Sequence, residues 1–183
     1  MVSACGIDRG AASPPPFTDP RLEQAYAYWC GKASGRAMPS RADIDPTEIP
    51  RLLPDVMLVE RLVDGRYRYR LIGTENQRAH GVNATGCYLD QVLPGPEYRA
   101  HVLALYDECV HTRRALYSEC LFFSPTRRDP ERHTKVLFMP LSPDERNVNV
   151  IFVVQVFFYI DKATRERHFV DARPYKEIIH TLL

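Results

Sequence analysis

The sequence predicts an α+β domain in which one five-stranded antiparallel sheet carries helices on one face and an additional amphipathic helix precedes it. Strand-like segments occur as an early pair and a later group of three, and a long amphipathic segment separates the two groups. Turn-forming residues stand between neighbouring strands. Because neither strand group can bury a face alone, the two groups are expected to join in one sheet.

Composition narrows the classes of function. The chain has 183 residues, 45% of them hydrophobic, and a formal net charge of +1. Such a balance creates no strong field for nucleic acid or an anionic membrane, and neither is expected as a partner. The five cysteines are scattered and form no Cys-x-x-Cys pair, so no metal site is expected and the thiols fit a reducing, cytoplasmic setting. No apolar segment is long enough for a signal peptide or a membrane-spanning helix.

The first elements are a tail and a helix. Residues 1–18 are rich in Ala, Gly, Ser and Pro, which predicts a flexible tail. Asp19 and Pro20 then have the order of an N-cap and a first helical residue, which predicts an amphipathic helix over residues 19–35. Its apolar stripe follows the helical spacing i, i+3, i+4, i+7, i+8 with Leu22, Ala25, Tyr26, Trp29 and Cys30.

A hairpin begins the domain that we expect over residues 36–160. Four prolines in residues 36–54 leave room for only a short helical turn. Residues 56–62 and 66–71 are predicted strands, and Asp64-Gly65 between them is typical of a type I′ turn. The strict alternation of the second strand places Tyr67 and Tyr69 on one face and three arginines on the other.

The remaining elements alternate irregular and regular structure. Breaker residues in 73–91 predict short helical pieces that wall a pocket, and a long helix is expected over 96–113. Three strands follow at about 116–123, 135–141 and 148–158. Residues 161–183 are predicted to be an extension that ends in a short helix, because its apolar residues have helical spacing: Tyr175, Ile178, Ile179 and Leu182.

The last predicted strand of the domain is apolar on both faces, with Phe152 and Val154 on the side away from the long helix. Such a face must be covered. The N-terminal helix, through Leu22, Tyr26 and Trp29, is one candidate cover, and a second subunit is the other. The same five residues are therefore the predicted partner surface of a homodimer or of a signalling complex.

Several short motifs resemble a family of stand-alone PAS proteins found mainly in alphaproteobacteria. They are MPSRADIDP at 38–46, Ile-Pro at 49–50, Leu-Pro at 53–54, YRLIGT at 69–74 and GVNATG at 81–86. The resemblance extends over roughly residues 20–160. It implies the PAS fold and a sensory or regulatory role, and it implies no particular ligand.

Two cofactors that PAS domains use were compared with the sequence. Haem-binding PAS domains take an axial histidine from the long helix or its neighbourhood, and His101 is the candidate here because it borders the apolar stripe. Photoactive flavin PAS domains use a cysteine three places after a glycine. Here Cys87 directly follows Gly86, and Leu89 stands at the cysteine position. Neither cofactor is favoured.

The main hypothesis is a non-catalytic sensory module that binds a small ligand, a signalling protein partner, or both. The ligand is expected between the long helix and the inner face of the sheet, where the candidate lining residues are Tyr67, Tyr69, His101, Cys120 and Gln155. One alternative is a small enzyme on a curved-sheet scaffold of the thioesterase or isomerase type, which would need an acid or base inside the cavity. The other is a protein-interaction adaptor whose core is filled.

Overall fold

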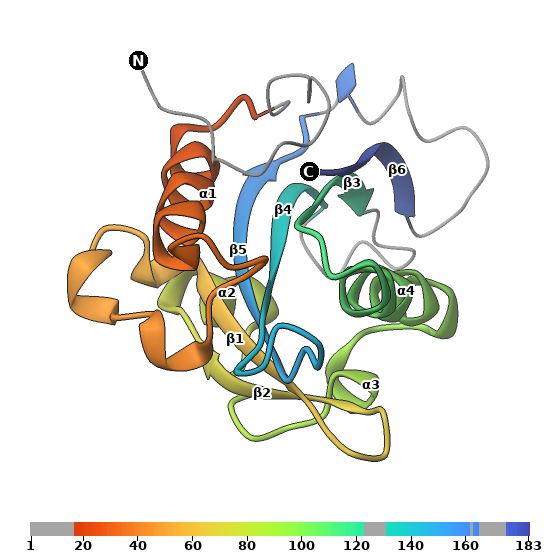
Figure 1. Ribbon diagram of the computed structural model, residues 1–183. Helices are drawn as coiled ribbons and strands as arrows, with labels where there is room; N and C mark the ends of the chain where they lie inside the picture. Colours follow the sequence, from red (N-terminus) through yellow and green to blue (C-terminus); the bar gives the residue numbers. More distant parts are fainter. Residues whose placement is uncertain (1–16, 123–130, 162, 165–174) are drawn as a thin grey trace.

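One six-stranded sheet organises the chain in the computed structural model, which describes residues 17–122, 131–161, 163–164 and 175–183 (Figure 1). The strand order is β2-β1-β5-β4-β3-β6, and all neighbouring strands are antiparallel. This confirms that the early hairpin and the later strands form a single sheet. The strands are β1 (Val56–Arg61), β2 (Tyr67–Ile72), β3 (Leu116–Phe122), β4 (Arg132–Leu141), β5 (Val150–Tyr159) and β6 (Tyr175–Leu182).

Helices cover both faces of this sheet. In Figure 1, α1 lies on one side of the central strands and α4 on the other. The face on the α4 side is called the inner face below, and the face under α1 is the outer face. The α-helices are α1 (Pro20–Ala33), α2 (Thr74–His80), α3 (Leu89–Val92) and α4 (Pro96–Thr112), and three short 3₁₀ turns cover Arg41–Asp43, Pro46–Glu48 and Leu53–Asp55. The predicted long helix and the short pieces before it are thus confirmed.

Helix α1 begins and packs as its sequence predicts. The carboxylate of Asp19 accepts a hydrogen bond from the backbone N–H of Arg21 at 2.9 Å and so caps the first turn. Leu22 is fully buried, and the indole N–H of Trp29 donates to the carbonyl of Pro140 in β4 at 3.0 Å. The N-terminal helix is therefore the cover of the outer face.

The hairpin between β1 and β2 is confirmed, but its turn is of another kind. The N–H of Leu62 donates to the carbonyl of Arg66 at 2.8 Å, so three residues form the loop. A type I′ turn would need positive φ at two neighbouring residues. Gly65 has a φ of 84°, whereas Asp64 is not in the left-handed region. One left-handed glycine after an ordinary turn closes the hairpin instead.

The predicted C-terminal helix is wrong, because the segment Tyr175–Leu182 is the strand β6. It pairs antiparallel with β3, from Leu116 opposite Leu182 to Phe122 opposite Tyr175. The spacing of its apolar residues fits a helix, but the free edge of β3 offers backbone donors and acceptors that need partners. The β-branched residues Ile178 and Ile179 add a preference for extended backbone. The sheet therefore has a sixth strand.

Candidate functional site

A small cavity lies between α4 and the inner face of the sheet, where the sequence places the ligand site. Its volume is about 40 Å³. Four of the five predicted lining residues surround it, namely Tyr69, His101, Cys120 and Gln155. The complete lining comprises Met57, Tyr69, His80, Leu93, Tyr98, His101, Val102, Leu105, Tyr106, Ser118, Cys120, Thr134, Val136, Phe138 and Gln155. Strand parity and helix phase thus predicted which side chains line this cavity, and that they bind a ligand stays a prediction.

Tyr67 is the predicted residue that does not line the cavity. Its side chain is buried, and its hydroxyl donates to the carboxylate of Asp107 at 2.7 Å. Its ring lies against that of Tyr106, with 5.2 Å between the ring centroids. The hydroxyl of Tyr67 is therefore occupied by a bond to α4, and the residue contributes to packing beside the cavity.

Two histidines that line the cavity each have a buried ring nitrogen without a hydrogen-bond partner among the described residues. The imidazole of His101 stacks on the ring of Tyr175 in β6, at 4.4 Å between centroids and 19° between planes. The imidazole of His80, from the end of α2, meets the ring of Phe157 edge-on at 6.4 Å. In both histidines the Nε2 atom is buried and has no hydrogen-bond partner among the described residues. Sequence reasoning missed His80 as a lining residue, because a helix of seven residues gives little phase information.

Burial keeps the ionisable groups of the cavity uncharged. It lowers the pKa of His80 to about 4, with Arg132 adding to the effect, and it also lowers the pKa of His101. It raises the pKa of the Cys120 thiol to about 12. A thiol with such a pKa stays protonated at neutral pH and is a poor nucleophile. Near pH 7 the cavity wall is thus neutral.

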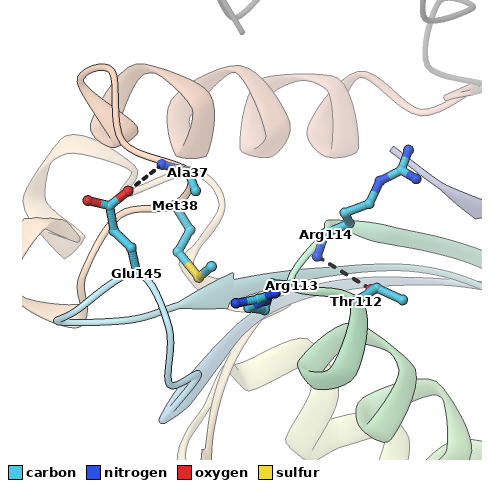
Figure 2. Close-up of a pocket in the computed structure, with 6 residues that line it drawn as sticks. All are labelled: Ala37, Met38, Thr112, Arg113, Arg114 and Glu145. Carbon is cyan, nitrogen blue, oxygen red and sulfur yellow. Dashed lines mark hydrogen bonds between the residues drawn. The ribbon is translucent and has the colours of Figure 1, made fainter.

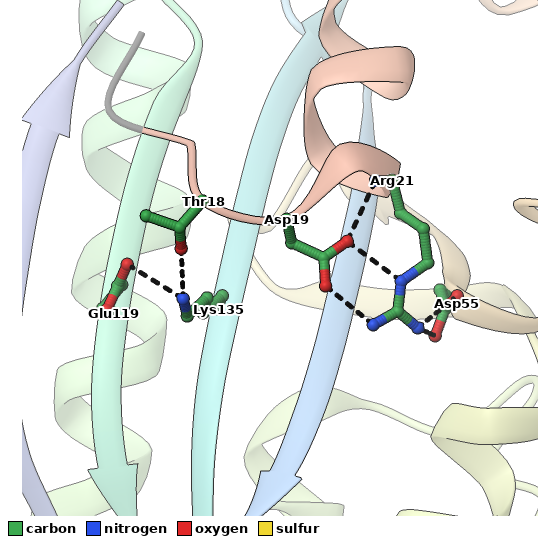
Figure 3. A network of polar contacts seen from close by, with 6 residues as sticks. All are labelled: Thr18, Asp19, Arg21, Asp55, Glu119 and Lys135. Atoms are coloured by element: carbon green, nitrogen blue, oxygen red, sulfur yellow. Dashed lines mark hydrogen bonds and ion pairs between the residues drawn. The ribbon is translucent and has the colours of Figure 1, made fainter.

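The acids that a hydrolytic enzyme would need lie elsewhere. Among the described residues, the cavity is lined by no Asp or Glu. Glu119 is almost fully buried, but it lies with Lys135 near the start of α1 on the outer face, as Figure 3 shows. There its carboxylate lies 3.1 Å from Nε2 of His133 and 3.7 Å from Nζ of Lys135. It also accepts a hydrogen bond from the hydroxyl of Tyr117. This geometry gives no support to the enzyme alternative.

A polar network holds the start of α1 against the sheet (Figure 3). The guanidinium of Arg21 bridges two carboxylates, at 2.8 Å from Asp19 and 3.2 Å from Asp55. The hydrogen bond from Arg21 lowers the pKa of Asp19, whereas burial raises the pKa of Asp55. Lys135 of β4 donates to the hydroxyl of Thr18. Both ends of the network thus tie the N-terminal segment to the sheet.

The predicted partner residues lie inside this same layer. Leu22, Trp29, Phe152 and Val154 are buried, and Tyr26 is half-buried with its ring stacked on that of Trp29. The chain's own helix therefore covers the apolar outer face. An interface formed through these residues would require α1 to leave the sheet, and the homodimer stays a prediction.

A second hollow opens on the surface at the far end of α4 (Figure 2). Its volume is about 450 Å³, and it lies between the loop after α1, the end of α4 and the β4–β5 turn. Glu145 accepts a hydrogen bond from the backbone N–H of Ala37 at 2.9 Å. Arg114 turns away and donates through Nε to the carbonyl of Leu183 at 3.3 Å. The other lining residues are Met38, Thr112 and Arg113.

The antiparallel sheet with its helix-covered inner cavity defines a class of sensory and regulatory domains, the PAS domains. A model of the PAS domain family matches residues 17–154, and the chain belongs to this family. Its fold resembles the solved PAS domain of BvgS from Bordetella pertussis, with a TM-score of 0.47 and 15% sequence identity, over 69% of this chain and 95% of that one. No curated protein sequence matches. In the described part of the chain, no helix is long and apolar enough to cross a membrane.

The two cofactors considered for His101 and Cys87 do not fit the cavity as it stands. A pocket for a drug-sized ligand measures about 300–1,000 Å³, whereas this one has about 40 Å³. A porphyrin or a flavin ring could enter only if α4 or the sheet moved. Cys87 is exposed, and it is not among the residues that line the cavity. The described residues also contain no group of three or more His, Cys, Asp or Glu side chains that could hold a metal ion.

Proposed function

We propose that the chain is a non-catalytic PAS sensor that binds a small ligand in its inner cavity. The observation that supports this proposal is the convergence of buried, unpartnered polar atoms on one cavity. Nε2 of His80 and Nε2 of His101 come from different helices, and within the described part of the chain each lacks a hydrogen-bond partner. Buried polar groups in native proteins are nearly always paired, so two unpaired groups at one cavity favour a ligand or solvent as their partner.

Native mass spectrometry of the chain purified from its own host tests this function. We expect a mass above that of the polypeptide, which returns to the polypeptide mass on denaturation. The variant Cys120→Leu, which adds volume to the cavity wall, should lose the extra mass. The matched variant Cys87→Leu changes an exposed cysteine outside the cavity and should keep it. A bare polypeptide mass in the wild type, with no binding to a panel of metabolites, would contradict ligand sensing.

The size of the cavity favours a second candidate, a ligand-free adaptor that acts through a protein partner. A volume of about 40 Å³ is close to that of a filled core. In this case the partner would bind at α1 and the outer face. It would shift the position of α1 on the sheet by binding one position of the helix more tightly than the other. Capture experiments with the full chain and with a full-length variant that carries Glu23→Lys and Ala27→Lys on the exposed side of α1 distinguish the candidates. The adaptor should lose its partner in this variant, whereas ligand binding in the inner cavity should persist.

A further inference from the structure

The chemistry of the inner cavity restricts the ligand that it can hold. Among the described residues that line it, none is Asp, Glu, Lys or Arg. The charges that act on the two imidazoles come from outside the lining, namely Arg132 on His80, and Glu177 and His180 on His101. Burying an ionised ligand without a counter-charge costs several kcal/mol or more, even after structural relaxation. The wall therefore disfavours both anions and cations.

The same wall has hydrogen-bonding groups to offer. Nε2 of His80 and Nε2 of His101 are buried and unpartnered. An unsatisfied buried polar group costs about 1–3 kcal/mol. A molecule that supplies the missing hydrogen bonds would recover part of this cost and so bind in preference to a purely apolar one.

The size of the inner cavity and its apolar lining restrict the ligand further. The volume of about 40 Å³ holds one or two water-sized groups. Met57, Leu93 and Phe138 belong to the apolar part of the lining. Methionine is flexible and adapts to irregular gaps, so a molecule of a few heavy atoms needs only local adjustment.

We infer that the cavity binds a compact, uncharged molecule with an apolar part and a hydrogen-bonding group, which His80 and His101 recognise. This inference rests on the proposed sensor function and names the ligand class of the same site. Acetamide has the required properties. Acetate has nearly the same shape and carries a charge, which makes the two a matched pair of probes.

The test is a titration of the full chain with each probe, in which calorimetry measures the affinity and the ¹⁵N signals of the histidine side chains report the place of binding. Acetamide should bind saturably and shift the signals of His80 and His101, with an affinity at least about tenfold higher than that of acetate, which corresponds to about 1.4 kcal/mol. The calorimetric response should disappear in a variant with both His80→Leu and His101→Leu. This variant removes unpartnered nitrogens and should remain folded. The matched variant His111→Leu changes an exposed histidine on α4 and should bind acetamide like the wild type.

Three outcomes would overturn the inference: equal responses to both probes, no saturable response to acetamide, or a response that survives in the double variant. The identity of a ligand found by native mass spectrometry separates this inference from the function on which it rests. A charged ligand at the cavity would leave the sensor function standing and contradict the uncharged class. If no ligand is found and acetamide causes no shift, both proposals fail together.

Discussion

Gly73 marks the point where β2 leaves the sheet and runs close to the 3₁₀ turn at Leu53–Asp55. Its N–H donates to the carbonyl of Val56 at 2.7 Å. A Cβ atom at this position would lie 2.3 Å from the carbonyl oxygens of both Leu53 and Pro54. Both contacts are with backbone, which cannot rotate away. Glycine is necessary here because the space beside its Cα admits only a hydrogen atom, and its φ is an ordinary one.

Gly73→Ala is therefore expected to destabilise the domain by about 1–3 kcal/mol or more, because the strand and the turn must move apart. Gly31→Ala is the matched control. A Cβ at Gly31 in α1 has nothing within 4 Å, and alanine in a helix is favoured over glycine by about 1 kcal/mol. Unfolding in urea measures both variants. Equal stability of Gly73→Ala and wild type would contradict the close approach of Gly73 to the turn at Leu53–Asp55.

The cavity histidine His80 makes a prediction about pH. Its pKa is lowered from 6.5 to about 4 by burial, so the unfolded chain takes up the proton first as the pH falls. The contribution of neutral His80 is complete above pH 6.5 and is lost progressively between pH 6.5 and 4, by up to about 3 kcal/mol. His80→Phe should reduce the loss of unfolding free energy between pH 7 and pH 4.5, whereas His111→Phe, at an exposed position, should not. An unchanged pH dependence in His80→Phe would contradict the burial effect.

The lining residues show which parts of a site can be predicted from sequence. Period-two alternation placed Tyr69, Cys120 and Gln155 on the inner face, and helix phase placed His101 there. Alternation predicts the face of the sheet on which a side chain lies, but not the position of the end of a long side chain. The hydroxyl of Tyr67 bonds to Asp107 beside the cavity, so Tyr67 does not line it. The unpartnered state of the histidine nitrogens depends on every neighbouring side chain, and no local pattern encodes it.

Among the elements, β6 joins the cavity to the edge of the sheet. Its first residue, Tyr175, stacks on His101 and lies 6.1 Å from the ring of Tyr98 between centroids. At its other end, the N–H of Leu183 donates to the carbonyl of Ala115 at 2.8 Å. The strand has no fully buried residue, so backbone bonds and a few aromatic contacts hold it.

Tyr175→Ala is expected to lower the unfolding free energy by about 1–3 kcal/mol, since it removes the aromatic contacts to α4. It should also shift the ¹⁵N signals of the His101 ring. Ile178→Ala is the matched control on the same strand, because Ile178 is 43% exposed. It should stay within about 0.5 kcal/mol of wild type. Equal effects of the two substitutions would mean that Tyr175 does not contact the cavity wall.

Elements with strong periodicity were predicted well, and β6 was not. Helix α4 and strands β4 and β5 have long, regular patterns and were placed to within a few residues. Apolar residues at 175, 178, 179 and 182 satisfy the helical spacing, and the decision in favour of a strand comes from β3, more than fifty residues earlier. A window along the chain contains no information about that partner.

At the scale of the whole molecule, the structure has three layers (Figure 1). The sheet is the middle layer, α1 lies on its outer face, and α2, α3 and α4 lie on its inner side. The single sheet and the need for a second cover were predictable, because β5 is apolar on both faces. The sequence left the choice between α1 and a second subunit as that cover open. The volume of the cavity was not. It is the small difference between the space enclosed by the layers and the summed volume of its lining side chains.

Removal of residues 1–35 should expose the outer face and cause self-association. Phe152, Val154, Leu137 and Met139 are fully buried in the complete chain, and an apolar patch of this kind drives association. Sedimentation should show a monomer or a discrete dimer for the full chain and larger species for the truncated one. A chain that lacks only residues 1–16 is the control and should behave like the full chain. Unchanged sedimentation of the longer truncation would contradict the role of α1 as the cover.

The position of β6 at the end of the sheet has a further consequence. A terminal strand leaves one row of backbone groups open to water, which invites copies of the same segment to stack on it. Lys176, Glu177 and His180 are exposed along this strand, and polar or charged side chains at such a margin discourage stacking. Replacing these three residues by threonine or valine should remove this protection, and the edge strand should then promote fibril formation.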